Sequence, residues 1–280
     1  MLKKKAISMF IAVIMSVMFF PGTLLPANKV QAADTSSGLV ARWTFDGNYT
    51  ETVNGLATNL GAKNLTYTEG IHGKAAVFNG KDNYLYVSEN PILNLGNSRT
   101  ENNDNITISA WINLGDSKYI DKYLLDKGKD TGWNNEDDCW WNNPYQLKFN
   151  GVEPTVYLSN EFTDNNDDSA STTGSTKTDG KTVEGEEWFL LTVTYDGQRV
   201  KIYHDNELLT QNNYTDGLTF NNEELYLGVD HTLQNYFKGA MDDLRLYTRT
   251  LSYEDVGAVS RRTCSKLGIS GADQTVSCVL

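Results

Sequence analysis

Hydrophobic and polar positions alternate along most of the chain in short runs that are typical of β-strands. The same period of two appears at residues 105–114, 189–195 and 225–229. Asp196-Gly197 and Asp205-Asn206 separate neighbouring runs and indicate hairpin turns. The pattern predicts an all-β protein, a two-sheet antiparallel sandwich. One strand face that we expect to line its core comprises Ile106, Ile108, Ala110, Ile112 and Leu114.

Two segments depart from this alternation. No helical period precedes residue 251, but Ser252 followed by Asp255 predicts the capped start of one short helix near the C-terminus. Residues 162–186 are rich in Ser, Thr, Asp and Gly and contain almost no apolar side chains, which predicts an exposed, mobile loop.

Two adjacent carboxylates stand in the last predicted strand, residues 239–247. Neighbouring side chains of a strand point to opposite faces, so Asp242 should share a face with Leu244 and Leu246, and Asp243 should lie on the other. A carboxylate beside two leucines faces the core or its edge. It therefore needs a hydrogen-bond donor, a cationic partner or a metal ion.

The last strand and four earlier stretches resemble one family. The pattern Gly-x-hydrophobic-Asp-Asp-hydrophobic-Arg-hydrophobic-Tyr, followed by Leu-Ser at a helix start, is similar to the last strand of LamG-like (laminin G-like, concanavalin A-like) domains of secreted bacterial proteins. These motifs span residues 39 to about 260 and imply a jelly roll, whereas they indicate activity only weakly because one fold hosts many functions. The other four stretches are LVARWTFDG (39–47), IHGKAAVFNGKDNYLYV (71–87), ITISAWINL (106–114) and EWFLLTVTYDGQRVKIYHDNELL (187–209).

The resemblance also implies a structural calcium ion. Asp46 and Asp242 match the family's acidic positions, and the first and last strands are neighbours in this fold, so we expect the two carboxylates to converge. Asn79 is a third candidate, as an amide or carbonyl ligand. Calcium binds such oxygen ligands, six to eight at a time. In the alternative interpretation Asp46 caps a turn and Asp242 accepts hydrogen bonds from backbone amides.

The N-terminal segment has the pattern of a bacterial secretory signal peptide. Lys3, Lys4 and Lys5 precede an apolar run at residues 6–20, and Val30-Gln31-Ala32 offers a cleavage site. The run is shorter than the roughly 20 residues of a membrane span. An uncleaved anchor is the alternative. We expect a signal peptide at 1–32, a LamG-like domain at 33–260, a tail at 261–280, secretion to the extracellular space and no later membrane span.

Charge and cysteine content change this picture in two ways. Removal of residues 1–32 takes away four lysines and no acids, so the net charge falls from −12 to about −16, which argues against nucleic acid or anionic lipid as a partner. Export permits disulfides. Cys264 and Cys278 would most economically pair and close a loop in the tail. Alternatively, Cys139 pairs with one of them.

A hydrophilic stretch at 130–145 concentrates aromatic side chains that could stack on sugar rings beside amides and carboxylates. The alternative is that Trp140 and Trp141 fold back and plug one end of the sandwich. We expect Trp43 and Trp188 to lie in the core, whereas Trp111 faces away from the aliphatic side of its strand. The predicted sugar-binding residues are Trp133, Trp140, Trp141, Tyr145, Asn142, Asn143 and Asp138, with Asn134, Asn135 and Asp137 as further polar groups.

Catalytic signals are weak. The three histidines, His72, His204 and His231, belong to no hydrolase or metalloprotease motif, and no paired-acid glucanase pattern is present. We therefore expect a secreted, non-catalytic carbohydrate-binding or adhesive module that binds a glycan or polysaccharide and carries a structural calcium. Two alternatives remain open: a glycoside hydrolase or polysaccharide lyase on the same scaffold, and a protein-interaction module.

Overall fold

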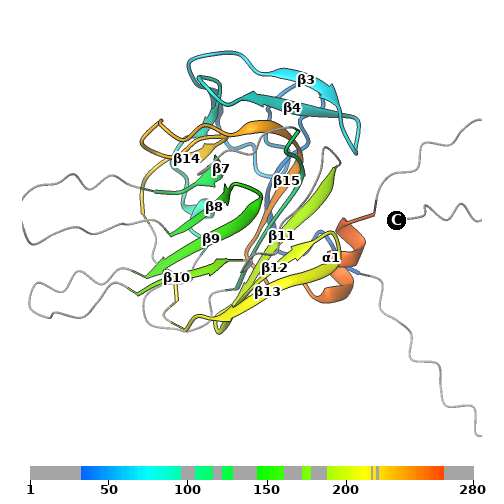
Figure 1. The fold of residues 1–280 in the computed structure, drawn as a ribbon, viewed down its shortest axis with the longest axis vertical. Coiled ribbons are helices and arrows are strands. Elements are labelled where there is room, and N and C mark those ends of the chain that lie inside the picture. The colour runs from blue at the N-terminus through cyan, green and yellow to red at the C-terminus, as the bar shows by residue number, and fades with distance from the viewer. Residues whose placement is uncertain are drawn as a thin grey trace, which may run out of the picture. The chain divides into compact units, whose positions relative to one another are not determined.

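A computed structural model describes residues 33–95, 105–115, 122–128, 144–160, 172–177, 188–215, 217–218 and 221–261. All of them belong to one compact unit, Ala33–Leu280. They form two antiparallel β-sheets and one short α-helix (Figure 1), so the predicted jelly-roll sandwich is confirmed. Among these residues no helix has the length and apolar character needed to cross a bilayer.

Sheet A contains eight strands, and β15 (Lys238–Tyr247) is its organising element. One edge of β15 pairs with β6 (Asn105–Asn113), and the other pairs with β4 (Lys74–Asn79) and then with β1 (Leu39–Trp43). The first and last strands are therefore neighbours, as predicted. The remaining strands extend the sheet at its two sides: β3 (Thr66–Glu69) beyond β4, and β11 (Phe189–Asp196), β12 (Arg199–His204) and β13 (Glu207–Asn213) beyond β6.

Sheet B contains seven strands. In spatial order they are β10 (Thr172–Lys177), β9 (Glu153–Asn160), β8 (Tyr145–Asn150), β7 (Lys122–Asp126), β14 (Leu225–Leu227), β5 (Leu85–Val87) and β2 (Thr58–Leu60). A single 3-10 turn, η1 (Pro91–Leu93), follows β5. The strand β10 lies inside the segment predicted to be a loop, and that prediction is wrong for residues 172–177. Its backbone pairs along β9, and this pairing needs no apolar side chains.

The core between the sheets is built from the apolar positions that alternate along the strands. The predicted face of β6 is buried, as are the alternate residues of β11 and β14. One row crosses sheet B from strand to strand through directly opposed residues, which share a face. This row consists of Leu60, Leu85, Leu227, Leu125, Leu147 and Val156.

A second, smaller hydrophobic cluster covers part of the outer face of sheet A. The helix α1 (Tyr253–Val259) begins at Ser252, whose hydroxyl accepts from the Asp255 backbone N–H in a reciprocal capping box, as predicted. Figure 1 shows α1 beside β11, β12 and β13, on the side away from sheet B. Its residues Val256 and Val259 pack against Trp111 and other outward-facing side chains.

Candidate functional site

A gap in strand pairing along β15 brings the predicted acidic residues together. The strand β4 pairs with residues 238–241 of β15, and β1 pairs with residues 244–247. Asp242 and Asp243 lie between these two partners. At this gap the chain leaves β1 toward Asp46 and enters β4 through the loop Gly70-Ile71-His72-Gly73, which we call the GIHG loop.

A β-bulge at the gap places both acids on the outer face of sheet A. The β15–β6 register shifts by one residue between Asp242 and Arg245, and Asp243 has a φ of 50°. Asp242 therefore lies opposite Trp111, outside the core, while Leu244 packs inside it. The prediction that Asp242 shares a face with Leu244 and Leu246 is wrong, because the extra residue reverses the alternation.

Asp242 is fully buried beneath the GIHG loop. Its Oδ2 accepts hydrogen bonds from the backbone N–H groups of Ile71 and His72, each at 2.8 Å. Among the described residues, its Oδ1 receives no hydrogen bond. Burial, together with the negative charges of Asp243 and Asp46, raises the pKa of Asp242 to about 7 despite the two N–H donors. An additional positive charge at Oδ1 would satisfy this carboxylate.

Asp46 meets the same loop from the end of β1. Its Oδ1 accepts from the Lys74 backbone N–H at 2.8 Å. Both glycines of the loop are needed for these approaches, because a Cβ on Gly73 would stand 2.0 Å from Asp46 Oδ1 and a Cβ on Gly70 would stand 2.5 Å from Asp242 Oδ2. Gly73 also has a φ of 87°, which favours glycine. Asp46 and Asp242 thus contact the two ends of the same loop, and a calcium ion shared between them stays a prediction.

Asp243, in contrast, is satisfied by arginine. Its Oδ1 accepts from Arg42 Nε at 2.6 Å, and its Oδ2 forms an ion pair with the Arg245 guanidinium. Burial opposes its charge, but the two guanidinium groups hold the pKa of Asp243 below its ordinary value. The imidazole of His72 lies 4.0 Å from Asp243 Oδ2 and packs edge-on against Trp111. The two adjacent acids therefore differ. Asp243 has two cationic partners, whereas one oxygen of Asp242 receives no hydrogen bond from the described residues.

The oxygens of Asp242 and Asp46 fit a calcium ion better than a transition metal, because both are hard carboxylate ligands. The described residues contain no group of three or more His, Cys, Asp and Glu side chains that could hold a metal. Further ligands would have to be backbone carbonyls or water. Asn79 does not join the pair. It lies at the opposite end of β4, about 17 Å from Lys74 at ~3.3 Å per residue, where its Oδ1 accepts from Lys81 N and closes a turn.

The predicted aromatic loop falls mostly outside the described residues, which exclude Trp133, Asp138, Trp140, Trp141, Asn142 and Asn143. Cys264 and Cys278 lie outside them as well. Tyr145 is described and differs from the expectation of a surface platform: it is fully buried in the core, and its hydroxyl donates to the Leu93 carbonyl at 2.8 Å. Trp43 is in the core as predicted, but Trp188 is only half-buried, on the outer face of sheet A.

Six tyrosines form a surface that the sequence reasoning missed, on the outer face of sheet B. We call it the tyrosine face. Tyr226 lies directly opposite Tyr86, and Tyr84 packs against Tyr226 and Tyr236 at ring-centroid distances of 6.3 and 6.1 Å. All six rings are half-buried, so each has solvent-accessible area. The tyrosine face comprises Tyr84, Tyr86, Tyr123, Tyr157, Tyr226 and Tyr236.

Polar groups lie between these rings in the same row. Across sheet B, Tyr226 is opposite Asp126, Asp126 is opposite Gln146, and Gln146 is opposite Tyr157. Asp126 is completely buried and accepts from Gln146 Nε2 at 2.8 Å. The Lys148 ammonium lies over the rings of Tyr123 and Tyr157, at 5.2 and 4.9 Å from their centroids. The charged groups of this row are thus engaged by their neighbours.

A histidine adjoins this row. His231 Nδ1 lies 2.7 Å from Asp126 Oδ2, and the same oxygen accepts from the His231 backbone N–H at 2.9 Å. The available sequence signal for the face was the alternation Tyr-Leu-Tyr at 84–86 and Leu-Tyr-Leu at 225–227. It indicates aromatic positions opposite the core in each strand, but not that the two strands are paired.

A family model described as the concanavalin A-like lectin/glucanases superfamily matches residues 79–257. No curated protein matches the chain. Among solved structures, the binding domain of Paraclostridial Mosquitocidal Protein 1 is 14% identical with a TM-score of 0.61, and the match covers 81% of this chain and 52% of that one.

Two further solved structures were determined with a bound glycan. Domain 4 of a GH43 extracellular arabinanase from Geobacillus stearothermophilus, in complex with arabinotriose, is 17% identical with a TM-score of 0.55, and the match covers 80% of this chain and 98% of that one. The binding domain of botulinum neurotoxin DC with SialylT is 10% identical with a TM-score of 0.57, over 81% and 52%. The chain spans about half of the toxin binding domains it matches. At these identities the likeness concerns the fold.

Proposed function

The chain belongs to the concanavalin A-like lectin/glucanase superfamily, and from this premise we propose that it is a secreted, non-catalytic carbohydrate-binding module with a structural calcium ion. The observation that carries the proposal is the tyrosine face. The solved complexes with arabinotriose and SialylT support it, because they show that this fold accommodates glycan binding in other proteins.

The chemistry of the tyrosine face suits a neutral polysaccharide chain. Flat rings stack on the apolar faces of sugars, and phenol hydroxyls and amides bond to sugar hydroxyl groups. The rings of Tyr86, Tyr226 and Tyr157 follow one row across strands β5 to β9, which offers an extended surface instead of a closed pocket. Asp126 and Lys148 are engaged within the face, and Glu224 accepts from the Tyr226 hydroxyl at 2.8 Å. An acidic sugar would therefore meet a carboxylate beside Tyr226.

Calcium would be held by Asp242 Oδ1 and the Asp46 carboxylate, with the GIHG loop between them. When bound, the ion supplies the positive charge that the buried Asp242 lacks and cross-links β1 to β15. Its role in this proposal is structural, because the site lies on the outer face of sheet A, whereas the tyrosine face belongs to sheet B. The calcium proposal rests on Asp242 Oδ1, which is buried and receives no hydrogen bond from the described residues.

A binding screen of residues 33–280 against immobilised neutral polysaccharides tests the proposed function. The Tyr86→Ala/Tyr226→Ala double variant removes two opposed rings and should weaken binding about tenfold to a hundredfold, since each aromatic contact contributes ~0.5–1.5 kcal/mol beyond its buried area. Tyr253→Ala is the matched control, because this exposed tyrosine on α1 lies outside the tyrosine face. Its affinity should equal that of the wild type.

The same screen distinguishes the predicted aromatic loop from the tyrosine face. If binding is lost in the Trp140→Ala/Trp141→Ala double variant and kept in the tyrosine variant, the glycan binds at the loop and the tyrosine face is not its site. If no polysaccharide is retained by the wild-type protein with or without calcium, the carbohydrate-binding proposal is wrong and a protein-interaction module is favoured.

One observation favours a glycan-cleaving enzyme as the second candidate. A buried carboxylate, Asp126, orients the imidazole of His231 beside the tyrosine face, an arrangement that can position a histidine as a general base. Free sugar and unsaturated products should be measured in the wells of the binding screen. Product release that is abolished in His231→Gln would replace the binding-module proposal with an enzyme, and binding without release supports the module.

A further inference from the structure

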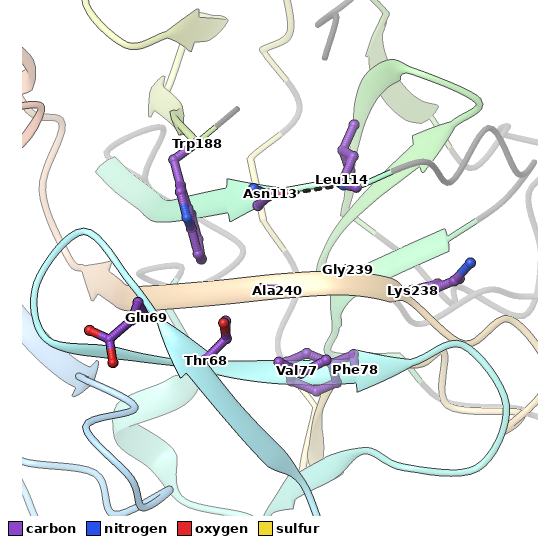
Figure 2. A pocket seen from close by; sticks show the side chains of 11 residues that line it. Thr68, Glu69, Val77, Phe78, Asn113, Leu114, Trp188, Lys238, Gly239 and Ala240 are labelled. Atoms are coloured by element: carbon purple, nitrogen blue, oxygen red, sulfur yellow. Dashed lines mark hydrogen bonds between the residues drawn. The ribbon is translucent and has the colours of Figure 1, made fainter. Parts of the chain in front are cut away.

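A groove of about 360 Å³ crosses the outer face of sheet A, apart from the tyrosine face. Its floor is a rung of three directly opposed residues, in which Ala240 of β15 lies between Asn113 of β6 and Val77 of β4. Figure 2 shows the Trp188 side chain pointing toward β15 from one side of this rung, with Thr68 and Glu69 on the other side of that strand. One wall is thus an indole ring, and the opposite wall is polar.

A small residue creates the hollow. Ala240 occupies the middle of the floor, opposite Asn113 and Val77, and its side chain is only a methyl group. Any larger residue at position 240 would project into the groove from the outer face of the strand. The groove therefore depends on the small side chain at position 240 and can be filled by a single substitution.

The lining has the composition of a sugar subsite. Trp188 provides a flat apolar surface, and Thr68 and the Asn113 amide nitrogen provide polar groups for hydrogen bonds to sugar hydroxyls. The Asn113 Oδ1 accepts from the Gly115 backbone N–H at 2.8 Å, and Figure 2 shows the Glu69 carboxylate directed away from Ala240. Lys238 lies at the far end, and Figure 2 shows its side chain directed away from Trp188. Glu69 and Lys238 lie at opposite ends of the lining and have opposite charges, so the groove has no net charge that would favour a charged sugar over a neutral one.

We propose that this groove is a second, separate sugar-binding site that takes the terminal one or two residues of a neutral glycan. Its volume lies at the lower end of the range for small-molecule sites, ~300–1,000 Å³, which suits one or two sugar rings and not a long chain segment. The inference extends the proposed function, because the tyrosine face belongs to the other sheet and presents an extended surface. The protein would then bind a polysaccharide chain at one sheet and a glycan end at the other.

Nuclear magnetic resonance titration of ¹⁵N-labelled residues 33–280 tests this proposal. The probes are methyl glycosides of glucose, galactose, mannose and xylose, and cellobiose, maltose and lactose. We expect at least one probe to produce saturable shifts of the Trp188 indole N–H and the Ala240 amide. Trp188→Ala removes the stacking wall and should weaken that probe about tenfold or more. Ala240→Leu fills the floor and should abolish the shifts while leaving Trp188 in place.

Matched variants separate this site from the tyrosine face. Tyr86→Ala/Tyr226→Ala should leave the titration unchanged, and Ala240→Leu should leave polysaccharide retention at the tyrosine face unchanged. If no probe shifts these signals at millimolar concentration, or if the shifts survive in Ala240→Leu, the groove is not a sugar site. Either result would overturn this inference without affecting the tyrosine face, which the polysaccharide screen tests independently.

Discussion

Asp242 lies directly opposite Trp111 in the ladder between β15 and β6, and both side chains point away from the core between the sheets. Both are nevertheless buried, because the GIHG loop covers Asp242 and the residues of α1 pack around Trp111. A carboxylate is thus buried at a position outside the main core. Its neighbour Asp243 has two arginine partners, whereas one oxygen of Asp242 receives no hydrogen bond from the described residues.

The proposed calcium site predicts a ligand-dependent melting temperature. Calcium in excess over chelator should stabilise residues 33–280, by about 2.7 kcal/mol at a concentration of one hundred times Kd. Asp242→Ala should remove this dependence, because it deletes the buried oxygen, and should also lower stability in chelator by leaving Ile71 N–H and His72 N–H without their acceptor. Differential scanning calorimetry in calcium and in chelator measures both effects. A wild-type protein with equal melting temperatures in the two buffers would exclude the metal site.

Asp242 also predicts an unusual pH dependence in chelator. Its pKa is raised to about 7 in the folded protein from an ordinary value of 3.8. The folded state therefore binds the proton more tightly, so this group makes stability fall as pH rises from about 4 to about 7. Asp242→Asn keeps an acceptor for the loop and removes the charge. It should be more stable than wild type at pH 7.5 in chelator, on the order of 4 kcal/mol, and about equal at pH 4.

Denaturant unfolding at the two pH values tests the titration of Asp242. The stability difference between Asp242→Asn and wild type should shrink as pH falls. A difference that is independent of pH would mean that Asp242 does not titrate in this window.

The GIHG loop predicts that replacing Gly73 by alanine destabilises the protein more than replacing Gly55 by alanine. Gly73 and Gly55 both have positive φ, 87° and 66°, so alanine introduces backbone strain at each, ~1–2 kcal/mol. Only at Gly73 would the new Cβ collide with a carboxylate, Asp46, whereas Gly55 has no atom within 4 Å. Gly73→Ala should therefore lose at least about 1 kcal/mol more than Gly55→Ala and should lose the calcium response, which Gly55→Ala keeps. Equal losses in the two variants would argue against a tight contact between Gly73 and Asp46.

The arginine-paired acid predicts a large loss of stability when its charge is removed. Asp243→Asn preserves a residue type that tolerates positive φ but leaves Arg42 and Arg245 without their carboxylate, which should cost about 3–5 kcal/mol. Because the pKa of Asp243 is lowered, its contribution is present above pH 3.8 and is lost as pH falls through the folded pKa. Glu207→Gln, at an exposed position of β13, is the control and should change stability little. A loss no larger than that of the control would mean that the arginines find other partners.

Much of the fold could be predicted from local pattern. Ile106, Ile108 and Ile112 are buried on one face because a period of two is a property of each strand alone. Ser252 and Asp255 cap α1 because the capping box needs only residues three apart. Asp196-Gly197 joins β11 to β12 for the same reason, since a hairpin turn is encoded in its own residues.

The parts that could not be predicted depend on contacts between distant segments. The alternation placed Asp242 beside Leu244, but the bulge in β15 reverses that assignment, and the bulge exists where two partner strands leave a gap. Asn79, like Asp46, has a side-chain oxygen that could bind a metal ion. The length of β4 nevertheless separates Asn79 from Asp46 and Asp242. Trp188 has the pattern of a core residue but lies on the outer face of sheet A and lines the groove.

The amino-acid sequence was sufficient for strands with a clear period of two, such as β6 and β11, for their buried faces, for the capped helix and for the family, because these depend on residues that are close together in the chain. The tertiary structure decided which side of the sheet Asp242 and Asp243 occupy, and it brought Asp46 and Asp242 to the same loop. It also assembled six tyrosines from separate strands into one face and left a groove beside Trp188. Strand order and register bring together residues that are far apart in the sequence, and a pattern of period two contains no information about which strands will pair.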